Sequence, residues 1–485
     1  MAWEAVIGLE CHVQLRTRTK MFCGCPVAYG SEPNTNVCPV CLGLPGALPR
    51  TNAAALAFAL RLGVALGCTI RAESVFARKN YFYPDMPKNY QVTQYERTLC
   101  EGGALPLARE GGGRAIALTR IHCEEDAGKS FHPERQGDRR WSRVDLNRAG
   151  VPLLELVTEP VLRSPAECAA FLTELRRLVR WLGVSDGDME KGQLRCDANV
   201  SLRPTGSTTL GTKTELKNLN SIKGVERGVA AEIARQTALL DAGERVRQAT
   251  LLYDADHERL AVMRMKEHAH DYRYFPDPDL PVLRVSEAQR AEATAASPEL
   301  PWAREARYRD ALELPAYDAA VLTESRDLGD YYEACVPPGE PKLASNWVMT
   351  EVMRVLKTRD WSVAEWAARV PAPRLRELLA RVAARELPGP VAKQVFAWFL
   401  EQDGSVAELL ERHGVRVAGG DEELLPIVRA VLDENPGPVA QVLAGRDATF
   451  GFLVGQAMKK SGGQAVPQVL QRLLREELAA RTPRP

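Results

Sequence analysis

Apolar and polar residues alternate along Val6–Leu15, near the start of the chain. Every second residue from Ile7 to Leu15 is apolar, and Glu10, His12 and Gln14 lie between them. A period of two predicts a β-strand with one core face and one polar face. A strand of an antiparallel sheet can keep its polar face in water, so this pattern alone also fits a merely solvated surface.

Other segments repeat this arrangement of carboxylates beside basic residues. The run LRCDANVSLR (194–203) alternates with Arg195 and Asp197 on its polar face, and TKTELKNL (212–219) aligns Lys213, Glu215 and Lys217. A further predicted strand, LTRIHCEEDAGK (118–129), ends in Glu124 and Glu125. Residues two apart on a strand share a face, so Glu10 and His12 could bind a common ion. Carboxylates suit Mg²⁺ and adjacent cations suit phosphate oxygens, so the pattern favours a catalytic sheet face that binds metal and nucleotide.

The periodicity changes from strands to helices along the chain. Two amphipathic helices are predicted within the first part, over 164–184 and 221–244, and Ser164 is the expected N-cap of the first. The run FPDPDLPVL (275–283) marks a boundary because its prolines forbid a continuous helix. From about residue 295 the pattern is helical, with a glycine-rich break over His413–Glu423. An α+β domain followed by helical domains is therefore expected.

Composition narrows the class of protein. A chain of 485 residues exceeds one ordinary core, and its 63 basic and 63 acidic residues restrict any nucleic-acid binding to local patches. We find no apolar run long enough for a membrane helix and no signal peptide, which predicts a cytoplasmic protein without membrane contact. Its cysteines are then expected to be thiols or metal ligands.

Four of the cysteines have the spacing of a metal site. Cys23, Cys25, Cys38 and Cys41 form a CxC–x12–CxxC pattern joined by a loop rich in Pro, Gly and Asn. Two short-spaced pairs are typical of structural Zn²⁺ with four thiolates; the alternative is four unrelated buried thiols.

A loop rich in aromatic residues carries two lysines. In ARKNYFYPDMPKNYQ (77–91), Lys79 and Lys88 flank a cluster that contains Tyr81. Such lysines suit phosphate oxygens, although an ordinary solvated loop is the alternative. We find neither a Walker A sequence nor a GxGxxG after a strand, so phosphoryl chemistry of the P-loop or protein-kinase type is excluded.

Long motifs of the chain resemble a known family. The segments ARKNYFYPDMPKNYQ, IHCEEDAGK, NRAGVPLLELVTEP, MEKGQLRCDANVSLR and GFLVGQAMKKSGG are similar to the B subunits of the aspartyl/glutamyl-tRNA(Asn/Gln) amidotransferases, GatB of GatCAB. The resemblance covers about residues 3–478. It implies an α+β fold: a catalytic cradle (1–292) with a glutamine-synthetase-like antiparallel sheet, an all-α helical domain (293–405) and a small YqeY-like α-helical tail domain (406–485) that binds tRNA.

The resemblance also implies an activity with its cofactors and partners. A ligase of this family phosphorylates the side-chain carboxylate of Glu-tRNA(Gln) or Asp-tRNA(Asn) with ATP and Mg²⁺, and ammonia then displaces the phosphate. The amidase subunit, GatA, makes the ammonia from glutamine, and the small subunit, GatC, holds the other two together. A larger complex with the non-discriminating aminoacyl-tRNA synthetase is a further expectation. Either misacylated tRNA, or both, could be the substrate.

Residue by residue, the resemblance implies roles for the polar positions. The catalytic residues are Glu125, Lys79 and Lys88. ATP is expected at Lys79, Tyr81, Lys88, Arg195, Lys213 and Lys217. Mg²⁺ is expected at Glu10, His12, Glu124, Glu125, Asp197 and Glu215, and structural Zn²⁺ at Cys23, Cys25, Cys38 and Cys41. Apart from the resemblance, Lys459 and Lys460 form a small basic loop before a helix, which suits the backbone phosphates of tRNA; a solvated loop on a helical packing module is the alternative.

Two other classes of function share some of these features. A stand-alone carboxylate–amine ligase for a small substrate would use the same sheet but would not need the helical and tail domains. A non-enzymatic tRNA-binding scaffold would explain the tail and the zinc, but not four strands that carry carboxylates.

Overall fold

The computed structural model describes residues 2–107, 113–131, 141–254, 257–265, 271–415, 421–444, 446, 449–462 and 465–481. The chain divides into two compact units, Met1–Ala303 and Arg304–Pro485.

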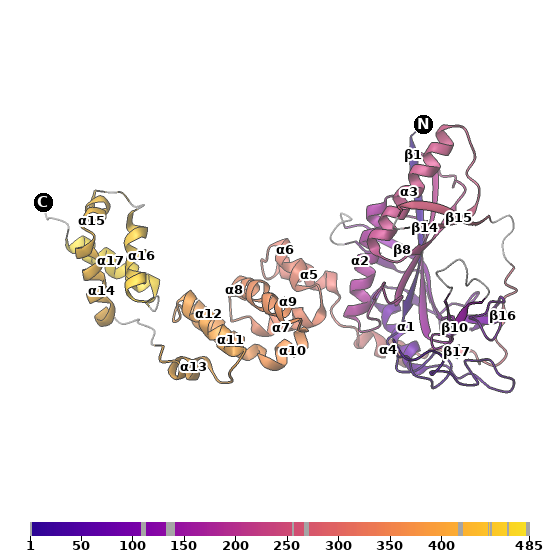
Figure 1. The fold of residues 1–485 in the computed structure, drawn as a ribbon, viewed down its shortest axis with the longest axis horizontal. Helices are drawn as coiled ribbons and strands as arrows, with labels where there is room; N and C mark the ends of the chain where they lie inside the picture. Colours follow the sequence, from indigo (N-terminus) through magenta and orange to yellow (C-terminus); the bar gives the residue numbers. More distant parts are fainter. Residues whose placement is uncertain are drawn as a thin grey trace. The chain divides into compact units, whose positions relative to one another are not determined.

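One large sheet dominates the first unit (Figure 1). Within the described residues it has ten strands: β1 (Trp3–Gln14), β2 (Thr69–Ile70), β6 (Cys100–Glu101), β7 (Ala104–Pro106), β8 (Ala115–Glu125), β11 (Pro152–Thr158), β12 (Leu194–Pro204), β13 (Thr214–Leu219), β14 (Ala249–Asp254) and β15 (Arg259–Met265). Their order is β15-β14-β13-β12-β1-β11-β8-β6-β2, and β7 pairs with β8. Neighbouring strands are antiparallel except β13 and β14. The predicted antiparallel sheet is confirmed.

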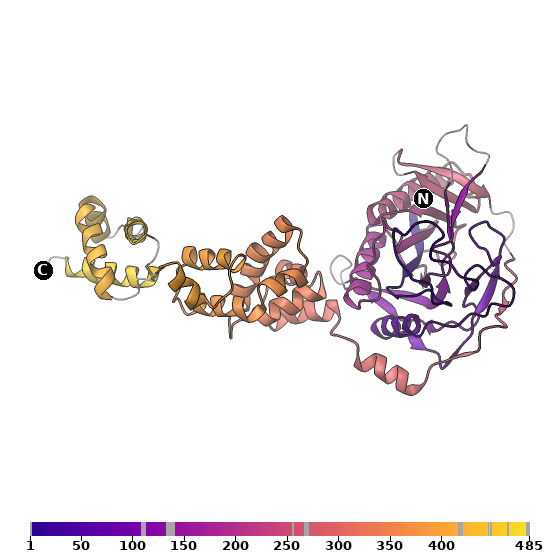
Figure 2. The same cartoon turned by 60° about the horizontal axis from the view of Figure 1, so that its bottom comes forward.

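Helices cover one face of this sheet. They are α1 (Ala53–Ala65), α2 (Pro165–Trp181) and α3 (Ile222–Asp241), and α4 (Glu287–Ala295) packs on α1. In Figure 1, α2 and α3 lie to the left of the strands, and α1 and α4 lie together at their lower end. Figure 2 shows the same unit turned by 60°. As predicted, Ser164 caps α2 by accepting from the backbone N–H of Glu167, with Pro165 in the first turn. The apolar positions of β1, including Ile7, are fully buried under these helices, which leaves the opposite face for the polar residues.

Short strands build smaller sheets beside the large one. These are β3 (Glu73–Ser74), β4 (Ala77–Asn80), β5 (Tyr90–Thr93), β9 (Lys129–Phe131), β10 (Arg143–Asp145), β16 (Phe275–Pro276) and β17 (Leu283–Arg284). The three-stranded sheet β16-β4-β5 contains Lys79, and β5 contacts the end of β8. The segments 77–93 and 275–276 are thereby held near the polar face.

The named elements in the described part of the second unit are all helices. Its elements, beginning with the helix that crosses the unit boundary, are α5 (Pro301–Asp310), α6 (Ala316–Leu322), α7 (Arg326–Cys335), α8 (Pro341–Trp347), the π-helical turn η2 (Val348–Val352), α9 (Met353–Arg359), α10 (Val363–Arg369), α11 (Ala372–Ala383), α12 (Gly389–Phe399), α13 (Val406–Arg412), α14 (Asp421–Glu434), α15 (Pro436–Leu443), α16 (Phe450–Lys460) and α17 (Pro467–Ala480). One hydrophobic core spans Tyr308–Leu409 and another spans Leu424–Leu478. The fold class is mixed α+β, as the sequence predicted.

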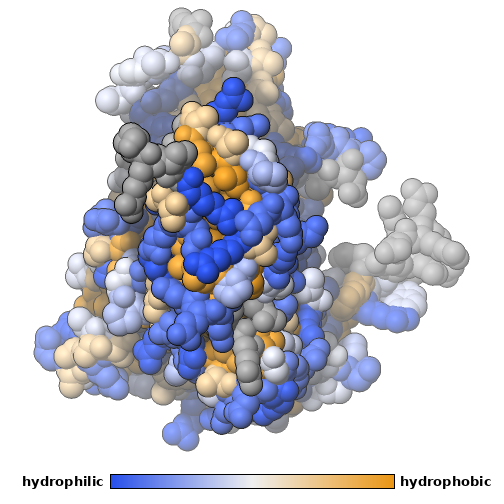
Figure 3. Space-filling view, turned by 90° about the vertical axis from the view of Figure 1, so that its left-hand side faces the viewer, coloured by the Kyte–Doolittle hydropathy of each residue, from blue (hydrophilic) through white to orange (hydrophobic). Residues whose placement is uncertain are grey.

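The surface carries apolar side chains as patches among hydrophilic ones (Figure 3). Within the described part of the chain, no helix is both long and apolar enough to cross a membrane.

Candidate functional site

The polar face of the large sheet gathers charged residues from five adjacent strands. β1 lies between β12 and β11, with His12 opposite Arg195 on one side and Glu155 on the other. The next pair along, on β11 and β8, sets Glu155 opposite His122. Residues opposite each other in antiparallel strands share a face, so this register lines up imidazoles and carboxylates across the sheet.

His12 contacts two carboxylates on this face. Its Nε2 lies 3.3 Å from Glu124 Oε1 and 3.5 Å from Glu155 Oε2. His122 Nε2 lies 3.4 Å from the same Glu155 oxygen, and Thr93 donates to Glu124 from 3.3 Å. Only 2% of the Glu124 side chain is exposed, so these charges interact with little screening by water.

The cluster shifts the pKa values of its members. Burial lowers the pKa of His12, but hydrogen bonds and charge from Glu124 and Glu155 outweigh it and raise the pKa to about 10. Burial raises the pKa of Glu155, whereas His122 and His12 lower it, leaving that pKa well below its ordinary value. Without a metal, a protonated His12 therefore supplies the cation between two carboxylates.

The donor set fits a divalent cation. Ligand atoms of His12, Glu124 and Glu155 lie within 4.8 Å of one another, so a single ion could contact all three. Two carboxylates suit Mg²⁺ or Mn²⁺, and the imidazole broadens the choice toward metals that accept nitrogen. Binding would displace the proton on His12, because the imidazole must be neutral to coordinate.

Glu155 was missed by sequence reasoning. It lies in the apolar run PLLELVT of β11, and the only sign of a functional role in that run is a single carboxylate among apolar residues. The run does not reveal that β11 pairs beside β1, and only this pairing puts Glu155 opposite His12.

Glu125 belongs to a separate group from Glu124. Its Oε1 accepts from Lys88 Nζ and, at 2.9 Å, from the backbone N–H of Val92. The partners of the Glu125 carboxylate come from the segment 88–92, whereas Glu124 contacts His12 and Thr93. The structure thus joins Glu125 with Lys88 and does not place it among the ligand atoms around His12.

The other predicted magnesium ligands form pairs further along the sheet. Lys217 forms an ion pair with Asp197 and, at 3.1 Å, with Glu215 Oε1. Glu10 accepts from Asn199 Nδ2 at 2.9 Å. The six residues predicted for Mg²⁺ are therefore distributed over several contacts and do not form one coordination shell in this state.

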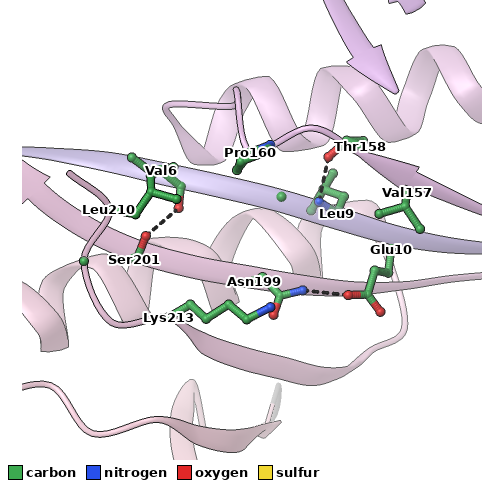
Figure 4. Close-up of a pocket in the computed structure, with 12 residues that line it drawn as sticks. Val6, Leu9, Glu10, Val157, Thr158, Pro160, Asn199, Ser201, Leu210 and Lys213 are labelled. Atoms are coloured by element: carbon green, nitrogen blue, oxygen red, sulfur yellow. Dashed lines mark hydrogen bonds between the residues drawn. The ribbon is translucent and has the colours of Figure 1, made fainter. Parts of the chain in front are cut away.

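A cavity of about 280 Å³ lies beside Glu10 on the same face (Figure 4). Val6, Gly8 and Glu10 of β1 line it, and Lys213 and Asn199 border it (Figure 4). Gly8 has no side chain and so leaves this space open. A Cβ atom added to Gly8 would lie in van der Waals contact with Pro160, 3.7 Å from its Cα. The cavity therefore has an apolar floor and charged edges.

The remaining predicted ATP residues lie around these groups. Lys79 Nζ lies 5.0 Å from the ring centre of Tyr272. Burial, together with the charge of Asp85, raises the pKa of Tyr81 above its ordinary value. Arg195 forms a 2.9 Å ion pair with Asp126.

The four predicted zinc ligands meet in space. One sulfur atom from each of Cys23, Cys25, Cys38 and Cys41 lies within 4.8 Å of the others, and Cys38 and Cys41 sulfurs are 3.9 Å apart. A tetrahedral Zn²⁺ with bonds of ~2.3 Å separates its sulfurs by ~3.8 Å, so the cluster fits zinc. The pKa of Cys41 falls to about 4, chiefly through a hydrogen bond from Cys23 that outweighs burial, with further lowering by Cys38 and Lys20.

Known proteins are similar to this chain in sequence over nearly its whole length. The family model for the GatB/GatE catalytic domain matches residues 5–291, and the model for the GatB domain matches residues 330–478. The B subunit of the aspartyl/glutamyl-tRNA(Asn/Gln) amidotransferase from Pelodictyon phaeoclathratiforme is 47% identical over 479 residues, covering 99% of this chain and 100% of the relative. The chain belongs to the GatB family.

Two further relatives in the GatB family cover the chain to the same extent. The B subunit from Chlorobaculum tepidum is 46% identical over 482 residues, and that from Moorella thermoacetica is 47% identical over 479 residues. Each match covers 99% of this chain and 100% of the relative. The family expected from the motifs is confirmed.

In this GatB chain, the two lysines predicted to bind tRNA differ in their surroundings. Both lie in the last turn of α16 and are exposed. Lys460 forms an ion pair with Glu434, which neutralises its charge locally. Gly463, the last residue of the motif GFLVGQAMKKSGG that contains both lysines, lies outside the described residues.

Proposed function

We propose that the polar face of the large sheet is where this GatB chain activates and amidates its substrate. The chain is the B subunit of a ligase that converts misacylated Glu-tRNA(Gln) or Asp-tRNA(Asn) to Gln-tRNA(Gln) or Asn-tRNA(Asn), and the family uses ATP. The observation that carries the proposal is the contact of His12 with Glu124 and Glu155, and Lys88 and Lys217 pair with other carboxylates of the same sheet. Acyl phosphorylation brings anions together, which a surface of cations and metal ligands can stabilise.

His12, Glu124 and Glu155 are the proposed holders of a divalent cation. When bound, Mg²⁺ would neutralise phosphate oxygens of ATP and charge that develops during phosphoryl transfer. Glu10, Asp197 and Glu215 remain candidates to contact a second ion or its water shell. Their pairing with Asn199 and Lys217 supports a site that reorganises when nucleotide and metal enter.

The cavity above Gly8 is the proposed position of the nucleotide base. Its apolar floor suits a flat ring, and Lys213 and Lys217 are the cations that would meet phosphate oxygens. Arg195, Lys79 and Tyr81 are proposed to line the path toward the substrate carboxylate.

Lys88 and Glu125 are proposed to act on the acyl group. Lys88 would donate a hydrogen bond to the acyl oxygen, stabilising negative charge as ammonia adds to the carbonyl carbon. Glu125 would accept a proton from the nitrogen as phosphate leaves and the amide forms. Their direct ion pair and the burial of Glu125 support this assignment.

The remaining assignments concern domains and partners. We propose a cradle (1–292) with a glutamine-synthetase-like sheet, a helical domain (293–405) and a YqeY-like tail domain (406–485) that binds tRNA through Lys459 and Lys460. The separate helical cores support more than one helical domain.

The relatives are named as B subunits, which supports a complex with GatA and GatC. We expect this complex to act in the cytoplasm on tRNA and to associate with the non-discriminating synthetase. The proposal assigns Zn²⁺ to the four cysteines.

The test uses the chain assembled with GatA and GatC. ATP hydrolysis that depends on misacylated tRNA, and transfer of ammonia to that tRNA, should both fall when Glu155 becomes Gln. Glutamine hydrolysis by GatA should persist. Exposed Glu190→Gln provides a matched control. Full amidation by the Glu155→Gln complex would reject the polar face as the catalytic site.

A further inference from the structure

A buried lysine lies between the four-cysteine cluster and the catalytic side of the sheet. Lys20 has 0% of its surface exposed and is among the largest fully buried side chains described. Its Nζ has two acceptors in the described part of the chain: Cys41 Sγ at 3.6 Å and the backbone oxygen of Leu146 at 3.3 Å. Because it is fully buried, Lys20 is placed to interact with the protein and not with a substrate.

The charge of Lys20 requires an anion nearby. A buried ammonium is costly unless it is paired and hydrogen-bonded, and the Leu146 carbonyl is neutral. Of the two groups that accept from Lys20 Nζ, only the thiolate of Cys41 can carry a negative charge. Zn²⁺ with four thiolates has a net charge of about −2, so an adjacent ammonium lowers the charge buried in the cluster.

The contacts of Lys20 join the cluster to the polar face. The backbone N–H of Lys20 donates to the backbone oxygen of Cys25 at 2.9 Å, which ties it to the first cysteine pair. A Cβ added to Gly150 would lie 3.5 Å from Lys20 Cδ, 3.6 Å from Cys41 Cβ and 3.7 Å from Glu125 Oε2. Lys20, Cys41 and Glu125 therefore surround one point of the chain.

We infer that Lys20 is a positioning residue for the zinc site: it donates to the Cys41 thiolate and fastens the cluster to the segment that carries Leu146 and Gly150. The inference rests on the proposal that the cysteines bind zinc. Groups that hydrogen-bond to metal ligands orient them, and their loss costs about 10–100-fold in metal affinity.

The first test measures zinc release from the assembled complex to a chromophoric chelator. Lys20→Met should release zinc about tenfold faster or more, while Lys223→Met, which changes an exposed lysine of α3, should match the wild type. In the cobalt-substituted complex, Lys20→Met should also shift the thiolate-to-cobalt absorption bands. Release rates and spectra equal to those of the wild type would overturn the inference.

The second test uses only the wild-type complex, so it still decides the question if the Lys20→Met chain fails to fold. The wild-type complex is treated with an amine-acetylating reagent before and after zinc is removed, and modified lysines are identified by mass spectrometry. Lys20 should react only after zinc removal, and Lys223 should react in both states. Equal protection of Lys20 in both states would overturn its link to the cluster. Wild-type protein that binds no zinc would instead reject the underlying zinc assignment.

Discussion

Glu124 and Glu125 are consecutive in the sequence, yet one carboxylate contacts His12 and the other contacts Lys88. In this state the two carboxylates have different partners, and Glu125 is not among the ligand atoms grouped around His12. The family motif that contains both residues thus supplies two different sets of contacts at the end of β8.

Substitution of these two residues should have different effects on metal binding. Glu124→Gln should weaken Mn²⁺ binding by at least about tenfold. Loss of a residue that only hydrogen-bonds to a metal ligand already costs about 10–100-fold in metal affinity, and Glu124 is a proposed ligand itself. Glu125→Gln should leave that affinity within about twofold but lower amidation. Mn²⁺ titration of the assembled complex by electron paramagnetic resonance measures the first quantity, and single-turnover amidation measures the second. Equal losses of Mn²⁺ affinity in both variants would contradict the separation.

Gly43 should control the position of Lys88. An added Cβ at Gly43 would lie 2.6 Å from Lys88 Cγ and 3.1 Å from Lys88 Cα, so the side chain cannot simply rotate away. Gly43→Ala is expected to lower the amidation rate about 10- to 100-fold by displacing Lys88.

Gly46→Ala is the matched control for that substitution. Gly46 has a similar left-handed backbone, with φ +83° against +67°, but an added Cβ meets nothing within 4 Å. Both variants bear the backbone strain, and Gly43→Ala alone adds the contact with Lys88. Zinc content should be measured in both. Similar amidation rates in the two variants would show that the contact does not matter.

Glu351 should give the π-helical turn a pH-dependent stability. Its Oε1 lies 3.0 Å from Lys393 and its Oε2 lies 2.7 Å from Arg354. Burial raises the pKa of Glu351, but these partners lower it overall, below the ordinary value of 4.5. The stabilisation is therefore present above pH 4.5 and is lost as pH falls through the lowered pKa.

Hydrogen exchange of the full chain checks this dependence. At pH 7, Glu351→Gln should speed exchange of the amides of η2 about three- to tenfold, allowing for the exposed partners. The ratio of variant to wild-type rates should approach one as the pH falls below about 4.5. Glu401→Gln, at an exposed position of the same unit, should not alter these amides. A ratio independent of pH would refute the role of the charge.

The two tail lysines should differ in tRNA binding. Lys459→Ala should reduce the slope of log affinity against log salt by about one, as loss of one phosphate contact does. Lys460→Ala should reduce it less, because Glu434 already neutralises that ammonium. Binding of misacylated tRNA by the complex across a salt series measures both slopes, with exposed Lys357→Ala as the control. An unchanged slope for Lys459→Ala would remove this residue from the tRNA contact.

Local pattern alone determined the strand faces and the cysteine site. Alternation in 6–15 and 194–203 specified which residues face the core, because the side-chain period of a strand is two. The CxC–x12–CxxC spacing likewise brought Cys23, Cys25, Cys38 and Cys41 together, since each pair is local and one loop closes the distance.

Tertiary structure decided which polar residues meet. Glu155 joins His12 because β11 pairs with β1 although the two strands are far apart in the sequence, and Lys20 reaches Cys41 only when two loops pack together. The pairing and register of strands that are distant in the sequence depend on how whole strands and helices pack. A short motif carries no information about that packing, so it cannot predict which strands pair. The sequence therefore determined the chemical groups and their local faces, whereas strand pairing and packing selected the partners of each group.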